Sequence, residues 1–227
     1  MKKLFANKKG RYRNLILLIL PFVILVCILG FVAFRGLKDM MGTITNDPAA
    51  NQSYSDIISM DYHLRGNATD LQKDLFKELQ EKADAEGEEK DDVATATAVA
   101  KNFVADFYTW TNKSGQSDIG GMYYVYSPSR INIYSQARDG FYHYLSHYIN
   151  EYGRENLLEV DTIEANGSQL SDADRYAVDD VSYDTYYVTV RWTYKPSAKF
   201  DTSKFRTEEN FTIIKNSEGR FEIVQAY

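Results

Sequence analysis

The segment Val181–Tyr194, VSYDTYYVTVRWTY, decides the fold class of this chain of 227 residues. Bulky side chains occupy alternate positions, which is typical of a β-strand with one buried face; they are Tyr186, Val188, Val190, Trp192 and Tyr194. Similar strands are expected at Phe205–Lys215 (FRTEENFTIIK) and Arg220–Ala226 (RFEIVQA), and Asn216–Gly219 between them has the composition of a hairpin turn. An earlier strand is expected at Leu158–Ile163. This half of the chain therefore predicts an antiparallel sheet.

Helical periodicity comes before the sheet. From Val93 to Trp110, apolar residues recur at spacings of three and four, with small residues first and aromatic residues last. A further helix is expected from about Asp139 until Gly153 stops it. Helices followed by antiparallel strands indicate one α+β domain over residues 93–227, with the helices packed on one face of a curved sheet.

The amino-terminal region contains an apolar stretch, LILLILPFVILVCILGFVAF, at residues 15–34. Twenty helical residues measure about 30 Å, the thickness of a bilayer's hydrocarbon core. The six basic residues of the preceding segment have no acidic counterpart there, and acidic residues follow the stretch. The positive-inside rule then predicts a cytoplasmic tail (1–14), one transmembrane helix (15–34) and an extracytoplasmic remainder at the cell membrane. A cleaved signal peptide is the alternative, but it requires a shorter apolar stretch and small residues at the cleavage site.

Residues 35–92 are predicted to be an extracytoplasmic linker, because their first part is polar. Within them, Thr69–Ala85 has leucines at spacing four, which predicts a short amphipathic helix with Asn67 or Thr69 as its N-cap. Two roles remain open for this helix. It rests on the domain as a solvated spacer, or it pairs with a copy of itself, although it is shorter than a convincing coiled coil.

The part of the chain beyond the apolar stretch is acidic. It holds 20 of the 26 basic residues and all 32 acidic residues, a net charge of −12. Affinity for nucleic acid depends mainly on lysine and arginine, so direct nucleic-acid binding is not expected. The single cysteine, Cys27, lies within the apolar stretch, so the exterior part must be stabilised by its own core without disulfides.

The sequence contains only weak matches to catalytic and metal-binding motifs. His143 and His147 have the i, i+4 spacing at which two imidazoles bind one metal, but the glutamate of a metalloprotease helix is missing and no third ligand is evident. Asp172 and Asp174 do not begin an EF-hand loop, because Ala177 stands where that loop needs glycine. They are expected in a solvated turn. We therefore expect neither a catalytic residue, nor a metal, nor a cofactor.

Two groups of aromatic residues are candidates for binding. Tyr123, Tyr124 and Tyr126 follow a glycine pair, so we expect them in a loop, where tyrosine supplies a large contact area with a polar tip. They form the candidate interface. The aromatic end of the first domain helix is the candidate lining of a pocket between that helix and the sheet; its residues are Phe103, Phe107, Tyr108 and Trp110.

The order of these elements resembles the cone-shaped nuclear-transport-factor-two-like fold. The points of likeness are an aromatic-ending first helix, a shorter helical region and a long meander that ends in GRFEIVQAY at Gly219–Tyr227. A short tail, one membrane helix, a linker and a single exterior domain of this kind resemble the inner-membrane assembly factors of type IV secretion systems and the related conjugation proteins of Gram-positive mobile elements.

In that family the exterior domain makes protein contacts within a DNA-transfer channel and catalyses nothing. The resemblance implies a non-catalytic, membrane-anchored scaffold or assembly subunit. Its expected partners are other envelope or transfer-channel proteins, or further copies of itself. The alternative is a small-molecule-binding or enzymatic extracytoplasmic domain of the same fold.

Overall fold

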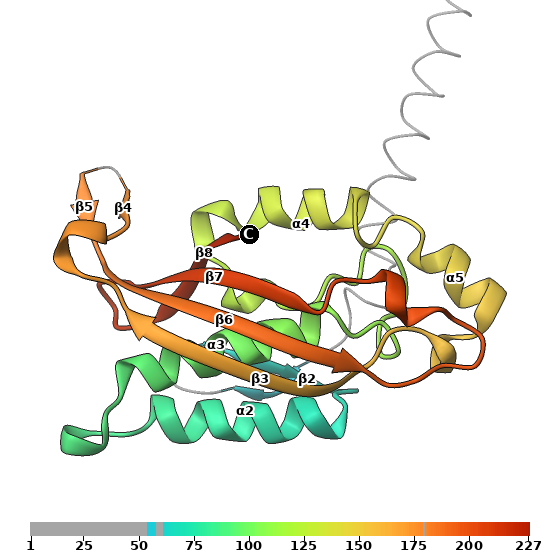
Figure 1. Ribbon diagram of the computed structural model, residues 1–227, viewed down its shortest axis with the longest axis horizontal. Coiled ribbons are helices and arrows are strands. Elements are labelled where there is room, and N and C mark those ends of the chain that lie inside the picture. Colours follow the sequence, from blue (N-terminus) through green and yellow to red (C-terminus); the bar gives the residue numbers. More distant parts are fainter. Residues whose placement is uncertain (1–53, 58–60, 179) are drawn as a thin grey trace, which may run out of the picture. The chain divides into compact units, whose positions relative to one another are not determined.

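A computed structural model describes residues 54–57, 61–178 and 180–227, which belong to the compact unit Asn51–Tyr227 (Figure 1). They form an α+β domain with an antiparallel sheet, as the sequence predicts. The predicted tail and transmembrane helix at residues 1–34 lie outside the described residues. Within the described ranges, no helix combines the length and the hydropathy that crossing a membrane requires.

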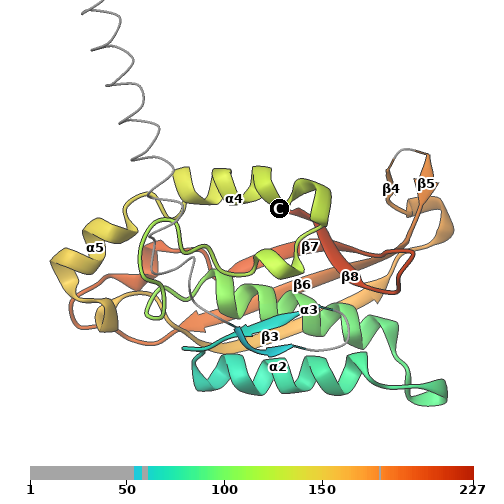
Figure 2. The same ribbon diagram turned by 180° about the vertical axis from the view of Figure 1, so that it is seen from behind.

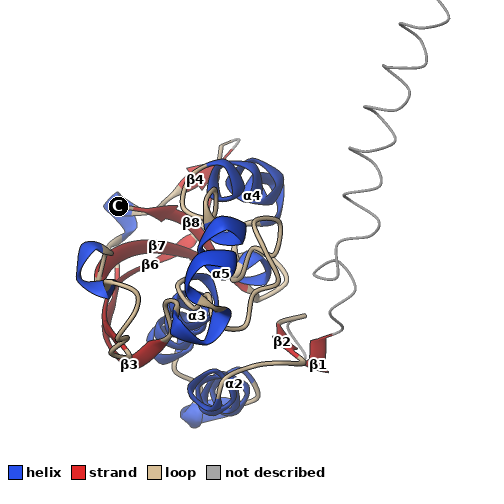
Figure 3. Ribbon diagram, turned by 90° about the vertical axis from the view of Figure 1, so that its right-hand side faces the viewer, coloured by secondary structure: helices blue, strands red, loops and turns tan. Residues whose placement is uncertain are grey.

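The main sheet has the strand order β3-β6-β7-β8 and is antiparallel throughout. Its strands are β3 (Val160–Gln169), β6 (Asp184–Tyr194), β7 (Glu208–Lys215) and β8 (Phe221–Ala226). The alternation in β6 is confirmed, because Tyr186, Val188 and Trp192 are buried. Figure 3 shows that the sheet is curved, with α3, α4 and α5 on one side of it.

Four α-helices lie within the described ranges: α2 (Asp70–Ala83), α3 (Asp92–Phe107), α4 (Arg130–Asp139) and α5 (Leu145–Tyr152). The N-cap prediction for α2 is confirmed at Thr69, whose side chain accepts a hydrogen bond from the Gln72 backbone while the Gln72 side chain accepts one from the Thr69 backbone. The helix expected from Asp139 begins later, because Gly140 interrupts the helical chain after α4.

The core extends upstream of the predicted domain boundary at Val93. Tyr62, Phe76 and Leu79 are buried in the same hydrophobic core as α3 and the sheet. They belong to the folded unit, where the sequence predicted a linker. Two short strands, β1 (Tyr54–Ile57) and β2 (His63–Arg65), form a hairpin just before α2.

The apolar stripe of α2 packs against α3 (Figure 2). The side-chain amide of Asn102 on α3 donates to the carbonyl of Leu75 at 2.9 Å, and the amide of Gln72 donates to the carbonyl of Ala105 at 2.8 Å. Of the two roles left open for this helix, it rests on the domain, with its stripe buried. Sequence could not distinguish the two, because periodicity reveals an apolar face but not what covers it.

A second hairpin lies apart from the main sheet and consists of β4 (Ala177–Val178) and β5 (Val181–Ser182). Asp172 and Asp174 lie in an exposed 3-10 turn before it. This placement agrees with the solvated turn that the sequence predicts.

Candidate functional site

The residues predicted to line a pocket come together, but their own rings fill the space between α3 and the sheet. The rings of Phe103 and Phe107 stack with their centroids 5.1 Å apart. The ring centroids of Tyr108 and of Trp192 on β6 lie 4.4 Å apart. The ring centroids of Trp110 and Phe205 lie 5.3 Å apart. The contacts of Tyr108 and Trp110 belong to a continuous group that we call the aromatic cluster, made up of Phe107, Tyr108, Trp110, Phe141, Trp192 and Phe205.

The predicted interface tyrosines do not form one surface. Tyr124 is only 3% exposed and its ring stacks on that of Tyr62, which corrects its expected place in an exposed loop. Tyr123 is half-buried, and its ring stacks on that of His63 with the two centroids 4.4 Å apart. The guanidinium of Arg130 lies 5.9 Å from the centroid of the Tyr123 ring. Tyr126 is half-buried, and its N–H donates to the carbonyl of Ile223. Val125 forms a bridge with Ile223 of β8, so this segment extends the sheet edge and turns Tyr124 inward.

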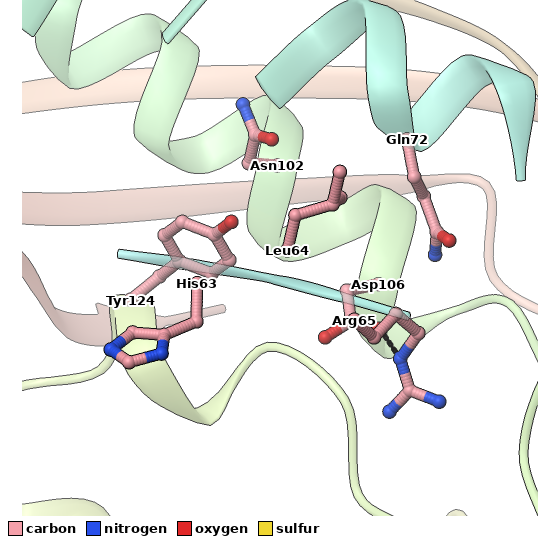
Figure 4. Close-up of a pocket in the computed structure, with 7 residues that line it drawn as sticks. All are labelled: His63, Leu64, Arg65, Gln72, Asn102, Asp106 and Tyr124. Carbon is pink, nitrogen blue, oxygen red and sulfur yellow. Dashed lines mark ion pairs between the residues drawn. The ribbon is translucent and has the colours of Figure 1, made fainter. Parts of the chain in front are cut away.

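A cluster of buried charges joins β2 to α3, and the sequence did not reveal it; Figure 4 shows two of its members, Arg65 and Asp106. Nε of Arg65 on β2 lies 2.9 Å from Oδ1 of Asp106 on α3, and Nη2 of Arg65 lies 2.9 Å from Oδ1 of Asp118. The ammonium of Lys113 lies 2.8 Å from Oδ1 of Asp106. We call these four residues the ion-pair cluster. It contains two cations and two carboxylates, so its formal charges cancel.

Backbone groups complete the ion-pair cluster. The N–H of Gly121 donates to Oδ2 of Asp106 at 2.7 Å, and the N–H of Ser114 donates to Oδ2 of Asp118 at 2.8 Å. Burial alone would raise the pKa of Asp106, but Arg65 and Lys113 together hold that pKa well below its usual range. Asp106 is therefore a carboxylate at neutral pH.

Lys113 differs from Asp106 in its electrostatic environment. Burial lowers the pKa of Lys113 to about 8, and the attraction of Asp106 is partly offset by the repulsion of Arg65. The carboxylates of Asp106 and Asp118 both attract the Lys113 ammonium, and the guanidinium of Arg65 repels it. The pKa of Lys113 is lowered because burial has the largest effect.

The space beside the ion-pair cluster is too small for a substrate. The cavity there, shown in Figure 4, has a volume of about 10 Å³ and is lined by residues that include Arg65, Gln72 and Asp106. That is room for about one water molecule. We conclude that the cluster has a structural role: it joins β2, α3 and the loop between residues 111 and 121.

Two consecutive glycines allow this loop to approach α3. A Cβ on Gly120 would lie 2.2 Å from the carbonyl oxygen of Asp106. Gly121 has a φ of +78°, and a Cβ there would lie 2.7 Å from the ring of Phe103. The glycine pair noted in the sequence thus serves close packing. The sequence held two local signals of the cluster: the position of this glycine pair two residues after Asp118, and a charged Asp106 among apolar positions of α3.

The two histidines at helical spacing do not share a helix. His143 lies in the turn between α4 and α5, whereas His147 lies on α5 and pairs with Glu151 at 3.0 Å. Both imidazoles are exposed. Within the described part of the chain, no group of three histidine, cysteine or acidic side chains is placed to hold a metal ion.

A surface groove of about 500 Å³ opens beside α4, and we call it the α4 groove. Its lining is mostly apolar and consists of Met122, Ser127, Pro128, Arg130, Ile131 and Tyr134. Ile131 is 78% exposed, a large exposure for an isoleucine. Arg130 supplies a positive charge and packs over the ring of Tyr123, so one candidate interface residue lies next to this groove.

No family model, curated protein or solved structure matches this chain. A fold alone does not establish a function, which depends on the residues of a site. Three features of the described domain are candidates for a structural or functional role: the ion-pair cluster, the aromatic cluster and the α4 groove.

Proposed function

We propose that this chain is a non-catalytic, membrane-anchored scaffold or assembly subunit of a conjugative transfer channel of the type IV secretion class. Residues 1–14 are the cytoplasmic tail, residues 15–34 are the membrane anchor, and the domain lies outside the cytoplasmic membrane. The apolar stretch and the basic residues before it support this arrangement. We further propose that the domain has the nuclear-transport-factor-two-like fold, which the order of α3, the shorter helices and the antiparallel sheet supports.

The α4 groove is the observation on which the proposed role depends. Exposed apolar patches with polar rims mark sites of protein contact. Ile131 and Tyr134 supply apolar surface in the groove, and Arg130 and the neighbouring Tyr123 are residue types enriched at interfaces. We therefore place a partner protein in this groove, either another envelope or channel component or a second copy of this chain. The acidic domain favours a protein partner over nucleic acid.

Crosslinking in native membranes tests this proposal, with an affinity tag at the carboxyl terminus of the full chain. We expect the unaltered protein to be recovered in a membrane-spanning complex. Ile131→Asp should remove the complex, because it puts a charge into the apolar groove while the first turn of α4 tolerates an acidic side chain. Val181→Asp is the matched control, since Val181 is an apolar residue that is 51% exposed on the separate β4–β5 hairpin.

Two results would contradict the proposal. One is recovery of the unaltered protein alone, without crosslinked partners. The other is equal loss of the complex in Ile131→Asp and Val181→Asp, because a groove-specific contact cannot depend on both positions. Circular dichroism of each variant establishes that the domain remains folded.

A further inference from the structure

β3 is an edge strand of the main sheet, and it pairs with β6 alone among the described strands. The N–H of Leu170 donates to the carbonyl of Thr185 on β6, so in this register the even-numbered residues of β3 direct their N–H and C=O groups toward β6. The residues between them, Ile163, Ala165 and Gly167, direct theirs to the other side, which we call the free edge. No hydrogen bond from the described part of the chain reaches these outward groups.

The opposite edge of the sheet is partly covered. Val125 forms a parallel bridge with Ile223 of β8, and the N–H of Tyr126 donates to the carbonyl of Ile223 at 2.9 Å. Figure 3 shows β8 and β3 at the two ends of the curved sheet. Proteins usually shorten, cover or bend their edge strands, because an open edge is a template for pairing with another chain. β3 is ten residues long, and its pairing shifts only near its start, between Val160 and Thr162.

The two faces of β3 have different surroundings. Ile163 and Ala165 are half-buried against the core, and a Cβ on Gly167 would clash with the hydroxyl of Thr97 on α3. The other face is exposed and consists of Thr162, Glu164, Asn166 and Ser168. In Figure 3, α2 and α3 lie on the same side of β3, and α2 packs mainly on α3. A strand added at the free edge would therefore have one face toward the helices and one toward solvent.

The exposed face of β3 is complementary to itself. The sequence of residues 162–168 is TIEANGS, with Ala165 at its centre. When two copies of this segment run antiparallel about Ala165, each Glu164 lies opposite the Asn166 of the other copy, and the amide donates to the carboxylate. The two hydroxyl residues, Thr162 and Ser168, also lie opposite each other. Centring the pair on Glu164 instead would oppose two like charges, which is unfavourable.

The inner face and the backbone fit the same arrangement. Ile163 lies opposite Gly167, so a large apolar side chain meets a residue that has none. The outward N–H and C=O groups then also face each other. Ala165 exchanges two hydrogen bonds with its counterpart, and Ile163 exchanges two with the Gly167 of the other copy.

We propose that two copies of this chain pair through the free edge of β3, antiparallel and with Ala165 opposite its counterpart. The two four-stranded sheets then form one continuous sheet across the dimer. The inference is independent of the scaffold proposal, because the α4 groove contributes no residue to β3. It assigns the second copy to β3 and leaves the α4 groove to a different protein.

Disulfide crosslinking of the full chain in native membranes tests the inference. Two differently tagged copies are co-expressed, one with Glu164→Cys and the other with Asn166→Cys, and Cys27, the only native cysteine, is replaced by alanine in both. Directly opposed residues have Cα atoms about 4.5–5.5 Å apart, which is within disulfide range. We expect a disulfide-linked product that carries both tags. Asn166→Cys expressed by itself should give less product, because that residue lies diagonally from its own counterpart.

Thr193→Cys is the matched control. Thr193 is exposed on the same face, and its hydroxyl lies 2.7 Å from that of Thr162, but it belongs to β6, one strand in from the free edge. It should give no product with itself. Ala165→Pro, added to both cysteine-containing copies, should remove most of the mixed-tag product. Proline at this position removes an outward N–H and leaves the hydrogen bonds to β6 in place. Circular dichroism establishes that this variant is folded.

Three results would overturn the inference: no mixed-tag product above the level of Thr193→Cys, more product from Asn166→Cys alone than from the mixed pair, or full product from a folded Ala165→Pro variant. The first two depend on no proline substitution. Ile131→Asp, which tests the α4 groove, should leave the β3 product unchanged, so failure of the scaffold proposal and failure of this one are distinguishable.

Discussion

The ammonium nitrogen of Lys113 and the Nε of Arg65 lie 2.8 Å and 2.9 Å from the same oxygen, Oδ1 of Asp106. The Lys113 side chain is completely buried. Through this oxygen, the hairpin that precedes α2 is joined to α3 and to the glycine-containing loop after it. Breaking one partner of a buried ion pair leaves an uncompensated charge, which is far more costly than losing an exposed pair.

Lys113→Met should destabilise the domain by about 3–5 kcal/mol, because Asp106 and Asp118 would then share only Arg65. Urea unfolding of a fragment of residues 51–227, the compact unit, measures this change. Lys77→Met is the control, since Lys77 and Glu81 are both exposed and 4.0 Å apart, and it should have little effect. Equal stability of the two variants would show that the buried ion pair contributes nothing specific.

Acid should lower the free energy of unfolding of the domain, because it protonates Asp106. Its folded-state pKa is depressed below the ordinary value of 3.8 by Arg65 and Lys113, against the opposing effect of burial. A depressed pKa contributes stability that is fully present above pH 3.8 and is lost as the pH falls through the folded-state value. Unfolding free energies measured from pH 6 down to about pH 2 should fall more steeply for the unaltered fragment than for Asp106→Asn. Parallel pH profiles would contradict this assignment.

Gly121→Ala should destabilise the domain by more than Gly219→Ala. Both glycines have positive φ, +78° and +84°, so both substitutions carry a similar backbone strain of about 1–2 kcal/mol. At Gly121 the added Cβ would also press on the ring of Phe103, whereas at Gly219 it would meet open space. Thermal unfolding of the two variants isolates the packing contribution, and identical melting temperatures would disprove it.

Leu79→Ala should cost about 2–5 kcal/mol, because Leu79 is fully buried in the shared core although it lies in the predicted linker. Leu71→Ala on the same helix should cost less, since Leu71 is only partly buried. Urea unfolding of the 51–227 fragment compares them. A fragment that begins at Val93 should fail to unfold cooperatively, because it lacks this part of the core; cooperative unfolding of that fragment would restore the predicted domain boundary.

The sequence predicted the elements of this fold better than the contacts between them. Strand alternation around Val188, the Asn216–Gly219 turn and the Thr69 cap are local patterns, and each was found at its predicted place. The candidate site was harder to predict. Tyr124 follows a glycine pair as a loop residue would, yet it is buried, because the segment beside it pairs with β8.

By itself, the sequence determined the α+β class and the position of most helices and strands, because hydrophobic period, capping and turn chemistry act over a few neighbouring residues. Only the tertiary structure decided what covers each apolar face. It brought Arg65, Asp106 and Lys113 together and buried the stripe of α2. These contacts join residues far apart in the chain, and a local pattern shows that a face is apolar or a side chain charged without showing its partner.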